Sequence, residues 1–169
     1  MRPNLKLNLI DPLELFIAET PKPIQSVRFA ARAGFVQTFQ PKANKDWKAR
    51  IKASVTSQLP VGWKPYKDTP LGVRVIYVFP PLTSFRKNDK ALINGGGVIP
   101  KHTKPDVSDN LNKGLFDAMT GVVWDDDSRV AYVECLKVHG NKVGIHVEVG
   151  RLSLEREEDE ERRSVPENV

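Results

Sequence analysis

An apolar helical pattern stands between two acidic clusters in one stretch, KPDVSDNLNKGLFDAMTGVVWDDDSRV, which runs from Lys104 to Val130. Apolar and polar residues recur there at helical spacing and separate onto two faces. The apolar face holds Leu111, Leu115, Ala118 and Met119, and the polar face holds Asn110, Lys113 and Asp117. A helix is therefore expected from Asp109, with Asp106 or Ser108 as its N-cap and Gly121 at its end.

The spacing of the two acidic clusters predicts that they meet. A helix from Asp109 to Gly121 advances about 18 Å at about 1.5 Å per residue, and an extended return from Gly121 to Asp127 covers about 20 Å at about 3.3 Å per residue. Because the two lengths match, Asp127 is expected beside Asp106 and Asp109. Three such carboxylates repel one another unless a cation neutralises them, and oxygen ligands favour magnesium or manganese. The pattern thus predicts a divalent-metal site.

Each cluster also has a purely structural interpretation. Aspartates before a helix commonly cap it, and a DDDS run is commonly a solvated turn. Lys113 and Asp117 could form an i,i+4 ion pair on the helix surface. Trp124 is expected in the core. Only the combination of the two clusters favours a metal site.

The flanking segments indicate a mixed α+β domain. Apolar residues recur at a spacing of four in Asn44–Leu59, which predicts a helix. RFAARAGFVQTFQP predicts a hairpin that bends near Ala33-Gly34. Alternating or β-branched runs predict further strands, the last two joined by the hairpin sequence HGN: Leu15–Thr20, Leu71–Pro81, Arg129–Val138 and Lys142–Leu152.

A polar segment, residues 82–105, shows no pattern of helix or strand. Such a loop inside a domain is usually functional or mobile. Its basic residues predict a flexible arm that contacts phosphates: Arg86, Lys87, Lys90, Lys101, His102 and Lys104. A disordered insertion kept soluble by its lysines is the alternative. The Gly95–Gly97 triplet lacks the lysine and hydroxyl residue of a P-loop, so no nucleotide cofactor is expected.

Length and charge suggest one basic domain with a charged tail. The chain has 169 residues and a formal net charge of +5. Residues 155–169 hold seven acidic and three basic side chains, so the expected domain, residues 1–154, carries +9. Such an excess suggests a polyanion such as nucleic acid, although a basic surface without a partner is an alternative. A single cysteine and an N-terminus without a long apolar run suggest a cytoplasmic protein with no membrane span.

The motif residues resemble the RusA family of Holliday-junction resolvases, which includes many phage and prophage members. PKPIQSVRF, together with KPDVSDNLNKGLFDAMTGVVWDDDSRV, is similar to the family pattern K-P-D-x-D-N-L-x-K, D-A-L-x-G and D-D-x-x-V. The resemblance spans roughly Thr20 to Val149. It implies a small dimeric α/β fold, with a largely antiparallel mixed sheet and two main helices on one side. It also implies magnesium- or manganese-dependent paired nicks in four-way DNA junctions of a bacterial host.

The resemblance also implies roles for individual residues. Asp109 and Asp127 match metal ligands, and Lys113 matches the basic catalytic residue of a metal-assisted phosphodiester hydrolysis. Asp106 would be the third metal ligand. The expected catalytic residues are therefore Asp106, Asp109, Lys113 and Asp127. Three further residues match supporting positions around the ligands: Asn110, Asp117 and Asp126.

One departure from the family pattern bears on the activity. Two residues, Val107 and Ser108, separate Asp106 from Asp109, whereas the family has one residue between its first two aspartates. A loop can absorb this insertion. If it does not, the chain is a junction-binding protein without cleavage. A nuclease for flapped or otherwise branched DNA is the third hypothesis.

Overall fold

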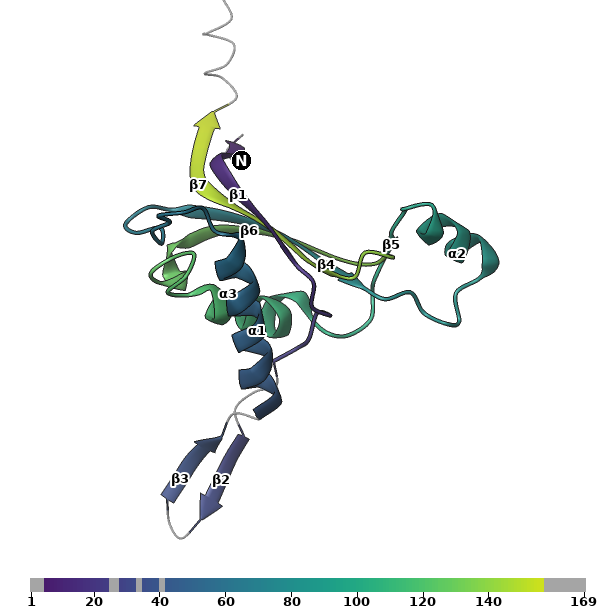
Figure 1. Cartoon of the computed structure of the whole chain (residues 1–169), viewed down its shortest axis with the longest axis horizontal. Helices are drawn as coiled ribbons and strands as arrows, with labels where there is room; N and C mark the ends of the chain where they lie inside the picture. Colours follow the sequence, from purple (N-terminus) through teal and green to yellow (C-terminus); the bar gives the residue numbers. More distant parts are fainter. Residues whose placement is uncertain (1–4, 25–27, 33–34, 40–41, 157–169) are drawn as a thin grey trace, which may run out of the picture.

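The computed structural model describes residues 5–24, 28–32, 35–39 and 42–156 (Figure 1). Within these ranges, side chains are not described for residues 5, 28–32, 35–39, 108, 109, 155 and 156. The acidic tail beyond residue 156 lies outside the described residues. Strand β7 runs through Arg156 and so includes the first two residues of the expected tail.

The described part of the chain contains one five-stranded sheet with the order β1-β7-β4-β6-β5. Only β4 and β6 pair in parallel, and the other neighbours pair antiparallel. A parallel pair needs a crossover connection, and the helices between β4 and β6 provide it. The expected mixed, mostly antiparallel sheet is therefore confirmed. Its strands are β1 (Leu5–Ile17), β4 (Leu71–Phe79), β5 (Ile99–Pro100), β6 (Val130–His139) and β7 (Gly144–Arg156).

Two helices cover one face of this sheet, as expected. They are α1 (Lys42–Gln58) and α3 (Lys113–Met119), the second preceded directly by a π-helical turn, η1 (Val107–Asn112). The spacing of four in α1 buries Trp47, Ile51 and Val55 against the core. At Gly114 the two helices approach closely, since a Cβ there would lie 3.3 Å from Cζ3 of Trp47.

The core lies between these helices and the sheet. Alternate residues of β4 point into it, and Val73, Val75 and Tyr77 are almost completely buried. The predicted apolar face of the central helix is buried as well: Leu111, Leu115, Ala118 and Met119. Trp124 is also in the core, so that structural interpretation is confirmed.

Several sequence-based boundaries shift. The first strand begins at Leu5 and ends at Ile17, earlier than the expected Leu15–Thr20. The hairpin is confirmed as β2 (Arg28–Arg32) and β3 (Phe35–Phe39), although its expected bend at 33–34 lies outside the described residues.

The expectation of no regular structure in residues 82–105 is wrong. The segment contains α2 (Lys87–Asn94) and the short strand β5. In Figure 1, α2 stands away from the sheet, beyond β5. It buries one large side chain, Ile93, so its sequence carries too little apolar periodicity to indicate a helix.

No helix among the described residues is both long enough and apolar enough to cross a membrane.

Candidate active site

The family-like motif enters its helix through a π turn. The Leu111 amide donates to the Asp106 carbonyl at 3.3 Å, which is an i to i−5 bond. Such a bond closes around one more residue than an α-helical bond does, and π turns occur frequently at functional sites. Asn112 has regular helical dihedral angles, φ −64° and ψ −44°. Residues 107–112, which include the spacing that departs from the family pattern, thus form a π turn, and α3 follows it directly.

Asp106 stands immediately before this turn in an extended conformation, with φ −74° and ψ 142°. Its side chain makes no capping hydrogen bond and is exposed. Asp106 therefore occupies the expected N-cap position, but its side chain does not cap the turn. Ser108 lies inside η1, so it is not the N-cap residue.

A hollow of about 320 Å³ lies beside the Asp106 carboxylate. Its lining residues are Pro23, Lys104, Pro105, Asp106 and Asn110. The Asn110 carbonyl also accepts a hydrogen bond from the Ile24 amide at 3.1 Å, which joins the segment after β1 to η1. An acidic group, a lysine and an amide thus share one open hollow.

Asp109 and Lys113 occupy successive turns of the same helical segment. Asp109 lies within η1, but its side chain is outside the described part of the structure. Lys113 is the first residue of α3 and is exposed. Lys113 follows Asp109 by four residues along this segment.

Asp117 points to a different partner from the one expected. Its carboxylate accepts a hydrogen bond from Lys48 Nζ of α1 at 2.6 Å. The proposed ion pair within the helix, between Lys113 and Asp117, is therefore replaced by a contact between two helices. This contact joins α3 to α1.

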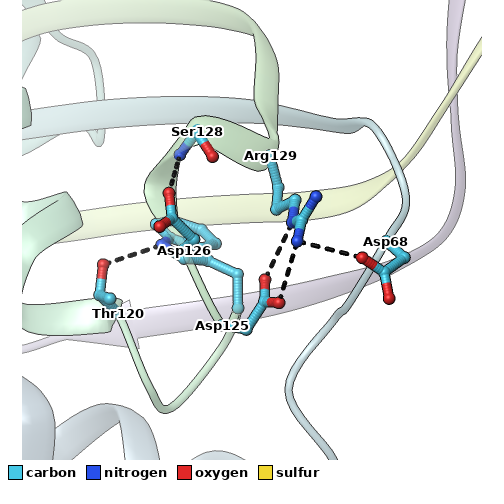
Figure 2. A network of polar contacts seen from close by, with 7 residues as sticks. Asp68, Thr120, Asp125, Asp126, Ser128 and Arg129 are labelled. Atoms are coloured by element: carbon cyan, nitrogen blue, oxygen red, sulfur yellow. Dashed lines mark hydrogen bonds and ion pairs between the residues drawn. The ribbon is translucent and has the colours of Figure 1, made fainter.

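The second acidic cluster is largely a structured turn, as Figure 2 shows. Arg129 donates to both carboxylate oxygens of Asp125 at 3.1 and 3.2 Å, and it also pairs with Asp68 at 3.1 Å. The hydrogen bonds from Arg129 hold the pKa of Asp125 below its ordinary value. The turn interpretation is therefore confirmed for Asp125.

Asp126 caps the short 3₁₀ helix η2 (Asp127–Arg129). Its Oδ1 accepts a hydrogen bond from the Ser128 amide at 2.8 Å. Hydrogen bonds from Ser128 lower the pKa of Asp126. Asp127, the first residue of η2, is exposed. Of the three consecutive aspartates, two are thus engaged within the turn.

The chain between α3 and this turn does not return as an extended segment. Amides of Val122 and Val123 both donate to the Met119 carbonyl, and Gly121 adopts φ +77°. The Gly121 amide donates to the Trp124 carbonyl at 2.7 Å. Residues 119–124 therefore form a tight turn at the end of α3, which a positive φ at glycine permits.

This turn keeps Asp127 away from Asp106 within one chain. Asp127 lies three residues before β6, whereas Lys137, near the far end of β6, contacts the carbonyls of Thr103 and Pro105. The strand from Val130 to Lys137 spans about 23 Å at about 3.3 Å per residue. The acidic turn and the start of η1 thus lie toward opposite ends of α3 (Figure 1). Two ligands of one ion lie within a few ångströms, because magnesium binds oxygen at about 2.1 Å.

The extended return on which the expected convergence of the three carboxylates rested is therefore wrong, because residues 119–124 form a tight turn. No group of three described His, Cys, Asp or Glu side chains is arranged to hold a metal ion. That set does not include Asp109. Asp106 and Asp109 remain neighbours in sequence at one end of the helical segment.

The six basic residues of segment 82–105 fall into two groups. Arg86, Lys87 and Lys90 belong to α2 or its N-cap, and Lys90 donates to the Thr83 carbonyl at 2.8 Å. The other three lie on the path from β5 to Asp106. Among these, the Nζ atom of Lys101 lies 5.2 Å from the centroid of the Phe79 ring, and His102 and Lys104 are exposed.

Sequence reasoning missed two polar contacts next to Asp106 and Lys113. Lys137 Nζ donates to the carbonyls of Thr103 and Pro105, both at 2.7 Å. Tyr77 donates to Asn112 Oδ1 at 2.7 Å. Both contacts join residues more than thirty positions apart. In the sequence, Lys137 and Tyr77 stand inside strand patterns, where nothing distinguishes them from ordinary strand residues.

Comparison with known families gives one match. The family model described as "Endodeoxyribonuclease RusA" matches residues 19–150, which covers most of the chain and both acidic clusters. Comparison with curated proteins gives no match. The chain therefore belongs to the RusA family of endodeoxyribonucleases, the enzymes that resolve Holliday junctions.

Proposed function

We propose that this resolvase requires magnesium, with manganese as a possible substitute, and that Asp106, Asp109 and Asp127 are its ligands. The observation that supports the proposal most is that the Asp106 carboxylate is exposed and has no capping role. This carboxylate lies beside a hollow and makes no capping hydrogen bond, although Asp106 immediately precedes a helix. Carboxylate oxygens are the ligands that magnesium prefers.

A second copy of the chain would supply the missing ligand. Within one chain Asp127 lies too far from Asp106 to share an ion, so a site built from three carboxylates has to combine Asp106 and Asp109 of one copy with Asp127 of another. A two-fold dimer would contain two such sites, and two sites suit two symmetric nicks in a four-way junction. The proposal therefore includes a homodimer that acts on branched DNA in the host cytoplasm.

Lys113 has the catalytic role in this proposal. When bound, the ion would neutralise charge on the scissile phosphate. The Lys113 side chain is exposed directly after η1, four residues beyond Asp109, where its ammonium group could donate to a phosphate oxygen as negative charge develops. Asn110, Asp117 and Asp126 would support the site by fixing η1, α3 and η2.

The basic residues around the hollow would hold the DNA backbone. Lys104 lines the hollow itself, and Lys101 and His102 precede it. Arg86, Lys87 and Lys90 would extend this basic surface along α2. Lysines and arginines that neutralise phosphates release counterions, so binding should weaken steeply with salt.

The test is cleavage of a synthetic four-way junction with magnesium and with EDTA, beside a flapped duplex of the same sequence. Magnesium-dependent paired nicks in the junction are expected. Binding without magnesium-dependent cleavage would overturn the metal proposal. Equal cleavage of the flap would overturn the preference for junctions.

A further inference from the structure

Two side chains outside the family-like ligand set tie the segment Thr103–Asn112 to the sheet at both of its ends. Lys137 of β6 holds the beginning of the segment, and Tyr77 of β4 holds its end through Asn112. Neither tie is used in the function proposed above. Both lie within a few residues of Asp106 or Lys113.

The first tie fixes the backbone directly before Asp106. Lys137 Nζ donates to the Thr103 and Pro105 carbonyls at 2.7 Å each. A hydrogen bond from an ammonium group is roughly twice as strong as a neutral one. The Lys101 amide also donates to the Lys137 carbonyl at 2.9 Å, so both the backbone and the side chain of Lys137 hold this path.

The second tie fixes the end of the π turn. Tyr77 is completely buried, and its hydroxyl donates to Asn112 Oδ1 at 2.7 Å. The amide nitrogen of Asn112 in turn donates to Cys135 Sγ of β6 at 3.1 Å. Burial raises the pKa of Tyr77 well above its ordinary value, so the hydroxyl keeps its proton and remains a donor. Asn112 is thereby connected to two neighbouring strands.

The turn between these ties has little support of its own. Its N-cap residue makes no side-chain capping bond, and π-helical turns are rare. A ligand before such a turn needs outside contacts to keep its position. Residues that orient metal ligands typically change metal affinity by about 10- to 100-fold when they are lost.

We propose that Lys137 and the Tyr77–Asn112 pair are positioning residues, which preset Asp106 and Asp109 for the divalent cation. The inference rests on the metal site proposed above. Lys137 would set the direction in which the chain reaches Asp106, and the Tyr77–Asn112 pair would fix the rotation of η1. Loss of either tie should weaken metal binding while the basic surface still holds DNA.

The experiment compares Tyr77→Phe and Lys137→Met with two matched controls, Tyr132 of β6 and Lys142 of the connection between β6 and β7. Tyr132→Phe removes a hydroxyl that donates to Glu134 at 3.3 Å, and Lys142→Met removes a lysine that stacks on Phe16. Manganese affinity is measured by titration calorimetry on the full chain. Four-way junction binding in EDTA and the melting temperature are measured in parallel.

The expected result is a manganese affinity weaker by about 10-fold or more in Tyr77→Phe and Lys137→Met, with junction binding in EDTA unchanged. Both controls should keep the wild-type affinity. Lys137→Arg should restore much of it, because a guanidinium group can also donate to two carbonyls. A merely structural role would lower the melting temperature without changing the manganese affinity of the folded protein.

Two results would overturn the inference in distinguishable ways. If the wild-type protein binds manganese and both variants bind it equally well, the ties do not position the ligands and only this inference fails. If the wild-type protein binds no manganese and cleaves no junction, the metal site itself is wrong and the inference fails with it.

Discussion

Asp106 and Asp127 lie toward opposite ends of the helical segment formed by η1 and α3. Strand β6 runs between their two positions, so its length indicates how far apart they are. The strand begins three residues after Asp127 and reaches the backbone before Asp106 only at Lys137. The two carboxylates that the sequence assigns to one ion therefore cannot share it within one chain. This relationship makes a second copy necessary for the site that we propose.

Substitution of Asp106 by asparagine separates a metal ligand from a structural residue. Asp106→Asn should raise the magnesium concentration needed for half-maximal cleavage by about 10-fold or more, because a ligand charge is lost. Asparagine caps helices about as well as aspartate, and Asp106 makes no capping bond, so the melting temperature should change little. A magnesium titration of single-turnover cleavage checks this. Wild-type magnesium dependence in the variant would remove Asp106 from the ligand set.

The π turn should tolerate removal of its extra residue. Deletion of Ser108 should convert η1 into an ordinary α-helical turn and leave junction cleavage within about threefold of wild type, because the shortened segment has the usual family spacing. Cleavage rate and helicity by circular dichroism are the measurements. Complete loss of cleavage with a folded chain would mean that the π turn itself is required.

Lys113→Ala distinguishes a catalytic group from a phosphate contact. If the ammonium group acts on the transition state, turnover should fall by about 100-fold or more while the junction affinity changes little. A phosphate contact alone would instead weaken binding and reduce its salt slope by about one unit. Single-turnover rates and binding across a salt series are compared. A loss confined to affinity would contradict the catalytic role.

The ion pair between Asp125 and Arg129 should make the acidic turn sensitive to pH. Hydrogen bonds from Arg129 lower the pKa of Asp125 in the folded chain, so this carboxylate stabilises the fold above its ordinary pKa of about 3.9. The stabilisation is lost as the pH falls through the lowered value. Asp125→Asn should therefore lower the urea midpoint at pH 7, and its difference from wild type should shrink toward pH 3. An equal difference at both pH values would contradict this assignment.

The sequence predicts the sheet and the helices on its face well, because the apolar pattern of each element lies within one short segment of the chain. Trp47, Ile51 and Val55 recur at a helical spacing of four, and all three are buried as expected. The β-branched run in β4 likewise forms a central strand. By contrast, α2 has a single large buried residue, Ile93, and its helix cannot be read from an apolar pattern.

The site is less predictable because its geometry depends on turns and on distant contacts. A π turn differs from an α turn by one residue, and no residue type specifies it. The spacing predicts an extended return from Gly121, whereas two amides fold back onto the Met119 carbonyl. The partner of Asp117 is Lys48, 69 residues away, rather than the lysine four residues before it. Such contacts form only when the whole fold is in place.

A mixing experiment tests the central claim, that the metal site combines two copies of the chain. At a magnesium concentration just sufficient for the wild-type protein, Asp106→Asn and Asp127→Asn should each lose cleavage, because a ligand charge is lost. Both should keep junction binding, because the basic surface is unchanged. A dimer that contains one chain of each variant should have one site with both substitutions and one intact site. Random mixing should then restore nicking to about a quarter of the wild-type level. Half of the dimers are mixed, and one of the two sites in each mixed dimer is intact.

The measurement is the nicking rate of a four-way junction after the two variants are unfolded together, refolded and assayed with magnesium. Recovery near a quarter of the wild-type rate, with each variant inactive when refolded alone, is the result that we predict. No recovery, with mixed dimers demonstrated by mass spectrometry, would show that Asp106 and Asp127 serve the same chain and would contradict the shared site.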